Sequence, residues 1–270
     1  MKLIIILLNI IHVYSYILPQ TFREWTIIGI DKNIYIHKPY QYKIGNLPMV
    51  LWYNNTKPQT IINSCHKHLG NTLKDSYVDE NKLICPYHKK GYTDEDNLGT
   101  IKKENGLLWW SYKSFKTNPP KIKGDNNNFH FEVRSDFISI ILNFISDFNG
   151  DEINYKFYKK KLLIKKERDF LIYKYPYTLI YNNKYMINII PIDNNNSHIY
   201  ITTSKQTTIY INEIEKLKSY IENRHNDFRY KYLLLTENNS YIKKVYNCYK
   251  EYMFPNDITI EYFLINKKFY

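Results

Sequence analysis

The chain has 270 residues, of which 44% are hydrophobic and 17% aromatic, and its formal net charge is +12. This length and apolar content suit a globular protein of one large or two modest domains, and they exclude an intrinsically disordered chain. The lysines are scattered and accompany no nucleic-acid-binding motif, which argues against a nucleic-acid partner and favours a solvated basic surface.

Residues 1–16 carry one positive charge at Lys2, followed by a mostly apolar run that Asn9 and His12 interrupt. The run is short for a membrane span, which needs about 20 apolar residues, and it has the length of a signal-peptide core. We predict a signal peptide or, as the alternative, a membrane anchor. Either one implies a location in the secretory pathway or at a membrane.

Residues 22 to 120 contain short β-branched and aromatic runs separated by Gly, Pro and Asn, a pattern typical of strands. The expected strands cover residues 25–29, 40–44, 49–53, 60–62, 82–84 and 106–112. The strands at 60–62 and 82–84 each lead directly into a short Cys/His cluster. The clusters should therefore lie on loops that a β scaffold can hold face to face.

The first cluster contains Cys65, His66 and His68, and the second contains Cys85 and His88. Thiolates and imidazoles are the ligands that zinc and iron–sulfur centres use, so the two clusters together predict a metal centre. The chain has only three cysteines, too few for a disulfide framework. A disulfide between Cys65 and Cys85 is nevertheless an alternative if the protein enters an oxidising compartment.

A pair of prolines and the polar stretch 121–128 indicate a linker, so we divide the chain near residue 125. Beyond it, apolar spacing predicts one helix over 136–147, a second that begins at Asn212 as its N-cap, and a third over about 240–254. Strands are expected over 170–181, 185–192 and 199–203. Helices and strands in mixed order predict an α+β domain.

The chain resembles the Rieske-type non-haem iron oxygenases, and among them most closely the Neverland-type cholesterol 7-desaturases. The family binds its [2Fe-2S] cluster with Cys-x-His followed by Cys-x2-His. His68, Cys85 and His88 match that pattern, whereas His66 stands where the family has its first cysteine and Cys65 lies beside it. Weaker matches in the same order are residues 68–73, 106–110 and 242–270.

The resemblance implies an α+β architecture of two domains. Residues 20–125 would form a β-sandwich-like Rieske-like [2Fe-2S] domain. Residues 126–270 would form an oxygenase catalytic-like domain, in which an antiparallel sheet and helices enclose a substrate pocket.

The resemblance also implies a mononuclear iron in the second domain, bound through the pattern Asn-x2-Asp-x2-His-x4-His. Here Asn143 matches the leading residue, but Ser146 replaces the aspartate, and Asn149 and Asn154 replace the histidines. The third iron ligand would fall near Asn239. Amide oxygens are weak ligands for ferrous iron, so we predict that this iron is absent and that oxygenase catalysis is lost.

For the site formed by the two Cys/His clusters, three alternatives stay open. A [2Fe-2S] cluster would use His68, Cys85 and His88 together with Cys65 or His66. Another metal such as zinc is the second alternative, and no metal at all, including the disulfide, is the third. Three further histidines are isolated in the sequence, and we interpret them as surface or core residues rather than ligands: His130, His198 and His225.

We therefore predict a degenerate Rieske oxygenase-like protein, a pseudoenzyme that binds a sterol-like or other apolar small molecule. One alternative is an active Rieske-type oxidoreductase that receives electrons from a donor protein. The other is a basic binding protein without redox chemistry. Whether the chain is an enzyme, and whether it forms oligomers as many relatives do, are left open by the sequence.

Overall fold

The computed structural model describes residues 24–34, 38–45, 47–65, 72–112, 118–122, 126–147, 154–158, 161–166, 168–193, 195–204 and 211–226, and residue 245. The expected leader over residues 1–16 lies outside these ranges, as does the expected helix over 240–254 except for residue 245. Within the described part of the chain, no helix combines the length and apolarity needed to cross a membrane.

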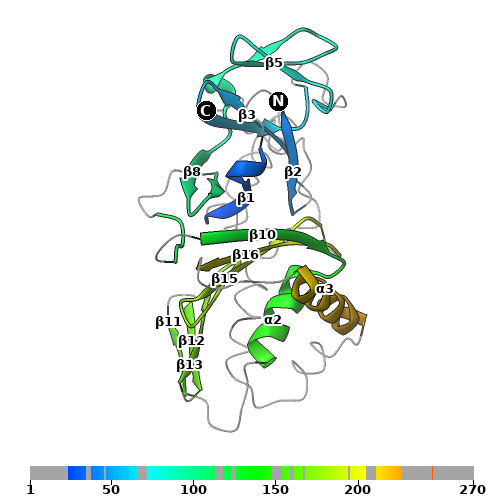
Figure 1. Cartoon of the computed structure of the whole chain (residues 1–270). Helices are drawn as coiled ribbons and strands as arrows, with labels where there is room; N and C mark the ends of the chain where they lie inside the picture. The colour runs from blue at the N-terminus through cyan, green and yellow to red at the C-terminus, as the bar shows by residue number, and fades with distance from the viewer. Residues whose placement is uncertain are drawn as a thin grey trace, which may run out of the picture.

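The amino-terminal part contains three antiparallel sheets of three strands each (Figure 1). The first has the order β1-β9-β8, the second β2-β3-β4 and the third β5-β6-β7. Two short 3-10 helices, η2 (Asp31–Asn33) and η3 (Asp94–Asp96), connect them. The strand bounds are β1 Thr26–Ile30, β2 Tyr40–Ile44, β3 Leu47–Asn54, β4 Lys57–Ile62, β5 Tyr77–Asp79, β6 Lys82–Ile84, β7 Gly91–Tyr92, β8 Thr100–Glu104 and β9 Leu107–Ser111.

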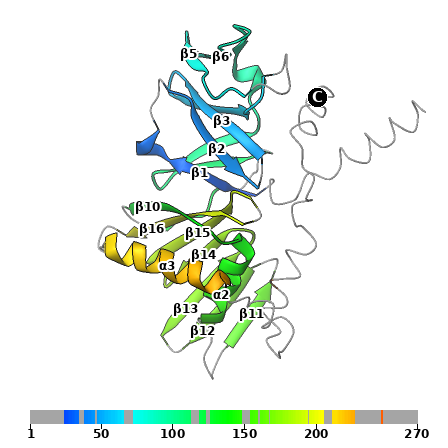
Figure 2. The same ribbon diagram turned by 90° about the vertical axis from the view of Figure 1, so that its right-hand side faces the viewer.

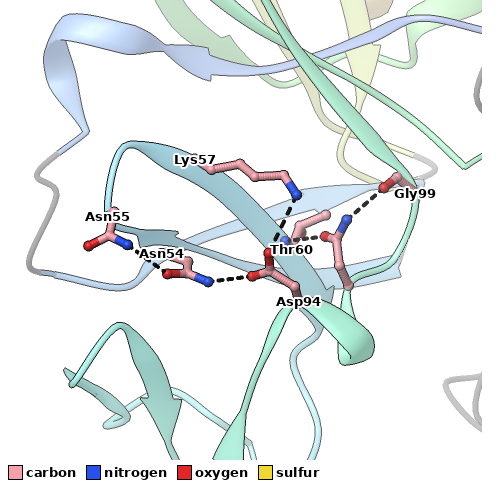
Figure 3. A network of polar contacts seen from close by, with 7 residues as sticks. Asn54, Asn55, Lys57, Thr60, Asp94 and Gly99 are labelled. Atoms are coloured by element: carbon pink, nitrogen blue, oxygen red, sulfur yellow. Dashed lines mark hydrogen bonds and ion pairs between the residues drawn. The ribbon is translucent and has the colours of Figure 1, made fainter.

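A polar network ties the β3–β4 hairpin to the segment around η3 (Figure 3). The Asn54 side chain donates to Asp94 Oδ1 at 2.5 Å, and the Thr60 backbone N–H donates to Asn97 Oδ1 at 2.8 Å. The Asn97 side chain in turn donates to the carbonyl of Gly99 at 2.8 Å. These bonds fix the strand that leads into the first Cys/His cluster, because β4 cannot shift without breaking them.

The carboxyl-terminal part is built on a seven-stranded antiparallel sheet with the order β10-β16-β15-β14-β13-β12-β11. Helices α2 (Phe137–Asp147) and α3 (Ile211–Asn226) lie against one face of it, as Figures 1 and 2 both show. The strand bounds are β10 Asn126–Val133, β11 Asn154–Tyr158, β12 Lys161–Lys166, β13 Asp169–Lys174, β14 Thr178–Tyr181, β15 Tyr185–Pro191 and β16 Ser197–Ser204.

One hydrophobic core joins the two parts. It includes the fully buried Trp109 and Trp110 of the amino-terminal part and Ile141 and Ile189 of the carboxyl-terminal part. Backbone hydrogen bonding crosses the boundary as well, since the Gly45 N–H donates to the carbonyl of Pro191 at 2.8 Å. A second, smaller cluster of buried side chains lies entirely within the amino-terminal part.

The expected α+β class is confirmed, and β2 and β6 have the bounds that the sequence predicted. Three expectations were wrong in detail. Asn126–Asn128 belong to β10 rather than to a linker, because β16 pairs with them along their length. Asn212 lies inside α3 rather than capping it. The expected strand over 170–181 is two strands, β13 and β14, separated by a turn at residues 175–177.

Candidate metal centre

The two cysteine-containing segments meet in the amino-terminal part. Cys65 follows β4 and Cys85 follows β6, as the sequence pattern indicated. The sulfur atoms of both cysteines and Nδ1 of His88 all lie within 4.8 Å of one another. Nδ1 of His88 is 3.3 Å from Sγ of Cys65 and 3.6 Å from Sγ of Cys85. Residues 23 positions apart in the chain thus point their metal-binding atoms at one spot.

A tight turn over residues 85–90 sets the position of His88. The Lys89 N–H donates to the carbonyl of Cys85 at 3.0 Å, and the Cys85 N–H donates to the carbonyl of Lys90 at 2.9 Å. Lys89 itself takes a φ of 52°. The turn brings the imidazole back over the cysteine that begins it, while the side chain of Tyr87 stays 63% exposed.

Asn63 holds both ends of the segment that carries the first cluster. Its backbone N–H donates to the carbonyl of Pro48 at 2.9 Å, which extends the pairing of β3 beyond the end of β4. Its side-chain oxygen accepts from the Leu73 N–H at 2.7 Å. Because Leu73 lies on the far side of residues 66–71, this one side chain closes the loop at its base.

Both cysteines are completely buried, and they pack with Trp52, Leu73 and Tyr92 in the smaller hydrophobic cluster. They form no disulfide with each other. The hydroxyl of Tyr92 donates to Sγ of Cys65 at 3.4 Å. A hydrogen bond to a ligating sulfur is one of the contacts that tune an iron–sulfur centre.

Two polar side chains are buried in the β3–β4 hairpin that leads towards Cys65. The side chains of Trp52 and Gln59 lie opposite each other on β3 and β4, on the face that also carries Val50 and Ile61. Trp52 Nε1 and both amide atoms of Gln59 are buried and have no hydrogen-bond partner among the described residues. Leaving such buried polar atoms unpaired is costly, so these two side chains are unusual within the interior of the amino-terminal part.

His66 and His68, the remaining predicted ligands, lie outside the described residues. The described geometry therefore brings together three of the five predicted ligand residues, Cys65, Cys85 and His88. The position of Cys65 beside the other two bears on the alternative between Cys65 and His66. The sulfur of Cys65 lies close enough to Cys85 and His88 to bind the same metal.

The residues at the expected mononuclear iron site are spread over two elements. Asn143 and Ser146 are half-buried on α2, and Asn154 is the first residue of β11. Asn149 and Asn239 lie outside the described residues. The absence of the mononuclear iron consequently remains a prediction.

Two histidines that the sequence indicated to be isolated lie side by side. Nε2 of His130 on β10 is 3.0 Å from Nδ1 of His198 on β16. Burial and, to a smaller extent, the neighbouring His130 together lower the pKa of His198 to about 4. Burial also lowers the pKa of His130. The interpretation as isolated residues was wrong because β10 and β16 pair although they are far apart in the sequence.

The comparisons with known proteins agree with this fold. Residues 24–110 match the Rieske [2Fe-2S] domain family. The fold is similar to that of Rieske non-haem iron oxygenases such as dicamba monooxygenase, in which a Rieske domain is followed by a catalytic domain. No curated protein matches.

Among solved structures, dicamba monooxygenase bound to dicamba aligns with a TM-score of 0.63 at 10% identity, covering 86% of this chain and 97% of that one. The same enzyme with non-haem iron and dicamba aligns at 0.62 and 10% identity, covering 85% and 96%. NdmA of Pseudomonas putida CBB5 aligns at 0.59 and 10% identity, covering 92% and 88%. At such low identity, these likenesses establish the fold alone.

The Rieske domain implies a [2Fe-2S] cluster, and the donor set meets its main requirement. In such centres two thiolates bind one iron and two imidazoles bind the other. Cys65 and Cys85 would supply both thiolates, and His88 would supply one imidazole. The second imidazole would have to come from the segment 66–71.

Proposed function

We propose that this protein is a Rieske oxygenase-like protein whose amino-terminal domain binds a [2Fe-2S] cluster through Cys65, Cys85, His88 and His68. The observation that carries the proposal is the convergence of two buried thiol sulfurs and one imidazole nitrogen. A cluster bound there would accept and release one electron at a time. The chain's own contribution is to bury the sulfurs, orient His88 and donate a hydrogen bond from Tyr92.

A spectroscopic experiment tests the cluster. Full-length protein purified without oxygen should show the absorption and electron paramagnetic resonance signals of a Rieske centre, with iron and sulfide in equal amounts. Cys65→Ser and Cys85→Ser should abolish the signals, whereas Cys248→Ser is the matched control and should keep them. Signals that survive Cys65→Ser but disappear in His66→Ala would assign the fourth ligand to His66 and overturn the proposed set.

One observation favours a second candidate for the same site. Sulfur-to-nitrogen separations of 3.3 and 3.6 Å match the edges of a tetrahedron around a single zinc ion, for which bonds of about 2.3 Å to sulfur and 2.0 Å to nitrogen give edges of about 3.5 Å. A colourless protein that contains zinc but neither iron nor sulfide would decide for this candidate. It would leave the domain structural rather than redox-active.

For the second domain, we propose that the mononuclear iron has been lost and that the pocket binds a sterol-like apolar molecule without converting it. The amides at Asn149, Asn154 and Asn239 and the resemblance to Neverland-type desaturases support this proposal. Binding of radiolabelled cholesterol, with no oxidised product when a chemical reductant and oxygen are supplied, is the expected result. Turnover would instead establish an active oxidoreductase that depends on an electron donor.

We further propose that residues 1–16 direct the chain to the secretory pathway or a membrane, on the strength of their single positive charge and short apolar run. Expression in a eukaryotic cell with a carboxyl-terminal tag tests this. A mature amino terminus near residue 16, or recovery of the uncleaved chain with membranes, is expected. Full-length protein in the cytosolic fraction would contradict it.

A further inference from the structure

Three metal-binding side chains gather on the seven-stranded sheet, away from the cysteines. They are His130 and Glu132 of β10 and His198 of β16, and one ligand atom from each lies within 4.8 Å of the others. The arrangement follows from strand geometry. Residues 130 and 132 point to the same face of β10, and Glu132 is directly opposite His198 in the antiparallel ladder. The three side chains are thus held by two hydrogen-bonded strands.

The distances within this cluster suit a single transition-metal ion. Nδ1 of His198 is 3.0 Å from Nε2 of His130 and 3.4 Å from Oε1 of Glu132. Zinc bonds to nitrogen and carboxylate oxygen are about 2.0 to 2.2 Å long. Two donors at that radius and at ordinary coordination angles lie about 3.0 to 3.4 Å apart. An ion at the centre would therefore reach all three atoms with little rearrangement.

Protons alone do not satisfy these contacts well. Nδ1 of His198 faces both the second imidazole and the carboxylate, and in a neutral ring it carries either one proton or one lone pair. With a proton it can donate fully to only one of its two neighbours. With a lone pair it accepts from His130 but then faces the lone pairs of Glu132. A cation between the three donors removes this conflict.

The cluster is rigidly supported on one side and open on the other. The His130 ring stacks on Tyr200, with centroids 4.5 Å apart and planes 19° apart, and the His198 side chain is only 12% exposed. Glu132 and His198 also line a cavity of about 260 Å³ between the two parts of the molecule. The opposite wall of that cavity includes Asn63, the residue that closes the loop after Cys65.

We propose that His130, Glu132 and His198 form a second metal site, specific for a borderline divalent transition-metal ion such as zinc or ferrous iron. Two imidazoles and one carboxylate suit these ions, whereas calcium and magnesium require a shell of oxygen ligands. Three protein ligands leave at least one coordination position, which opens towards the interdomain cavity. The site is independent of the proposed [2Fe-2S] centre, because it shares no ligand with it.

Calorimetric titration of the full-length protein with zinc chloride tests the site. Wild-type protein should bind one zinc ion that His198→Asn no longer binds. Glu132→Gln should weaken binding by at least about tenfold, since even the loss of a partner outside the coordination sphere costs 10- to 100-fold. The matched control His225→Asn should bind zinc like the wild type, and magnesium chloride should give no binding.

Two further measurements make the result decisive. The Glu132 side chain is 65% exposed, so Glu132→Gln should melt at the wild-type temperature and report on binding rather than folding. Cys85→Ser should keep the zinc ion even when the other centre is lost, so failure of one site is distinguishable from failure of the other. Zinc binding that Glu132→Gln and His198→Asn leave unchanged, or that Cys85→Ser alone removes, would overturn the proposal.

Discussion

The Tyr92 hydroxyl donates a hydrogen bond to the sulfur of Cys65, and this bond should raise the reduction potential of a cluster bound there. Reduction adds negative charge to the sulfur, so the donor stabilises the reduced form more. A hydrogen bond worth about 1 kcal/mol corresponds to about 40 mV for a one-electron couple. Tyr92→Phe should lower the potential measured by voltammetry by that order, whereas Tyr77→Phe, on the exposed β5, should leave it unchanged.

The buried hydroxyl of Tyr42 bonds to Oγ1 of Thr60 at 2.6 Å, and Thr60 itself donates to the carbonyl of Val50 at 3.0 Å. Tyr42→Phe removes one donor and leaves the Thr60 hydroxyl with its carbonyl partner. We expect a loss of about 1 kcal/mol in the free energy of unfolding, measured by urea denaturation. A loss of unfolding free energy several times larger would show that the Tyr42 hydroxyl stabilises the fold through more than this one hydrogen bond.

Buried tyrosines also give the protein a defined sensitivity to alkali. Burial raises the pKa of Tyr42 and of Tyr200 well above the ordinary value of 10.0. The folded state therefore holds these protons more tightly than the unfolded state does. Their contribution to stability is complete below about pH 10 and is lost as the pH rises further. Stability above that pH should fall less steeply in Tyr42→Phe than in the wild type, and equal slopes would contradict this reasoning.

At the scale of single residues, the sequence singled out Cys65, Cys85 and His88 among its candidate ligands but did not show that these three would meet. His88 and Cys85 are fixed by a short turn, so their spacing was informative. The choice between Cys65 and His66 depends on the path of one loop, and neighbouring residues in a chain do not reveal such a path. Pairing of β10 with β16 likewise decides that His130 meets His198, a contact between residues 68 positions apart.

Among the elements, the turn before β8 depends on a glycine. Gly99 has a φ of +86°, and a Cβ added there would lie 2.4 Å from the carbonyl oxygen of Ser111 and 2.7 Å from Nε1 of Trp110. Gly99→Ala should destabilise the protein by about 1–3 kcal/mol or more, because backbone strain and the clash add together. Thermal unfolding measures the effect, and an unchanged melting temperature would show that the turn can rearrange.

Elsewhere asparagine serves in turns where many proteins use glycine. Within the described part of the chain, five of the non-glycine residues with positive φ are asparagines, at positions 55, 81, 105, 182 and 183. Asparagine tolerates this conformation better than most residues do. The chain contains only 8 glycines, so its hairpins rely on this tolerance.

Strands with clear apolar runs were predictable, and strands defined by their partners were not. β2, β6 and β9 are bounded by turn residues and contain β-branched or aromatic side chains. β7 is only two residues long, and β8 carries Lys102, Lys103 and Glu104. Such segments become strands because an adjacent strand forms backbone hydrogen bonds with them, and their own sequence pattern does not reveal that partner.

The molecule as a whole has a hydrophobic core that crosses the boundary between its two parts. Because neither part buries its share of that core alone, we expect both to unfold together. Scanning calorimetry of the full-length protein should give one transition whose calorimetric and van't Hoff enthalpies agree. Two separate transitions would show that the parts are energetically independent.

The α+β fold class was predictable because a segment with strand patterns only is followed in the sequence by a segment in which helix and strand patterns mix. The contact surface between the parts was not, since it joins residues such as Gly45 and Pro191 that no motif connects.

The continuous core also limits how such a protein can be recombined. Transplanting residues 24–110 onto the sheet of a distant relative would uncover tryptophan and isoleucine side chains that evolved to fit this particular partner surface. Exchanging one part alone should therefore yield insoluble hybrids, unless the core residues on both sides of the boundary are exchanged as a matched set.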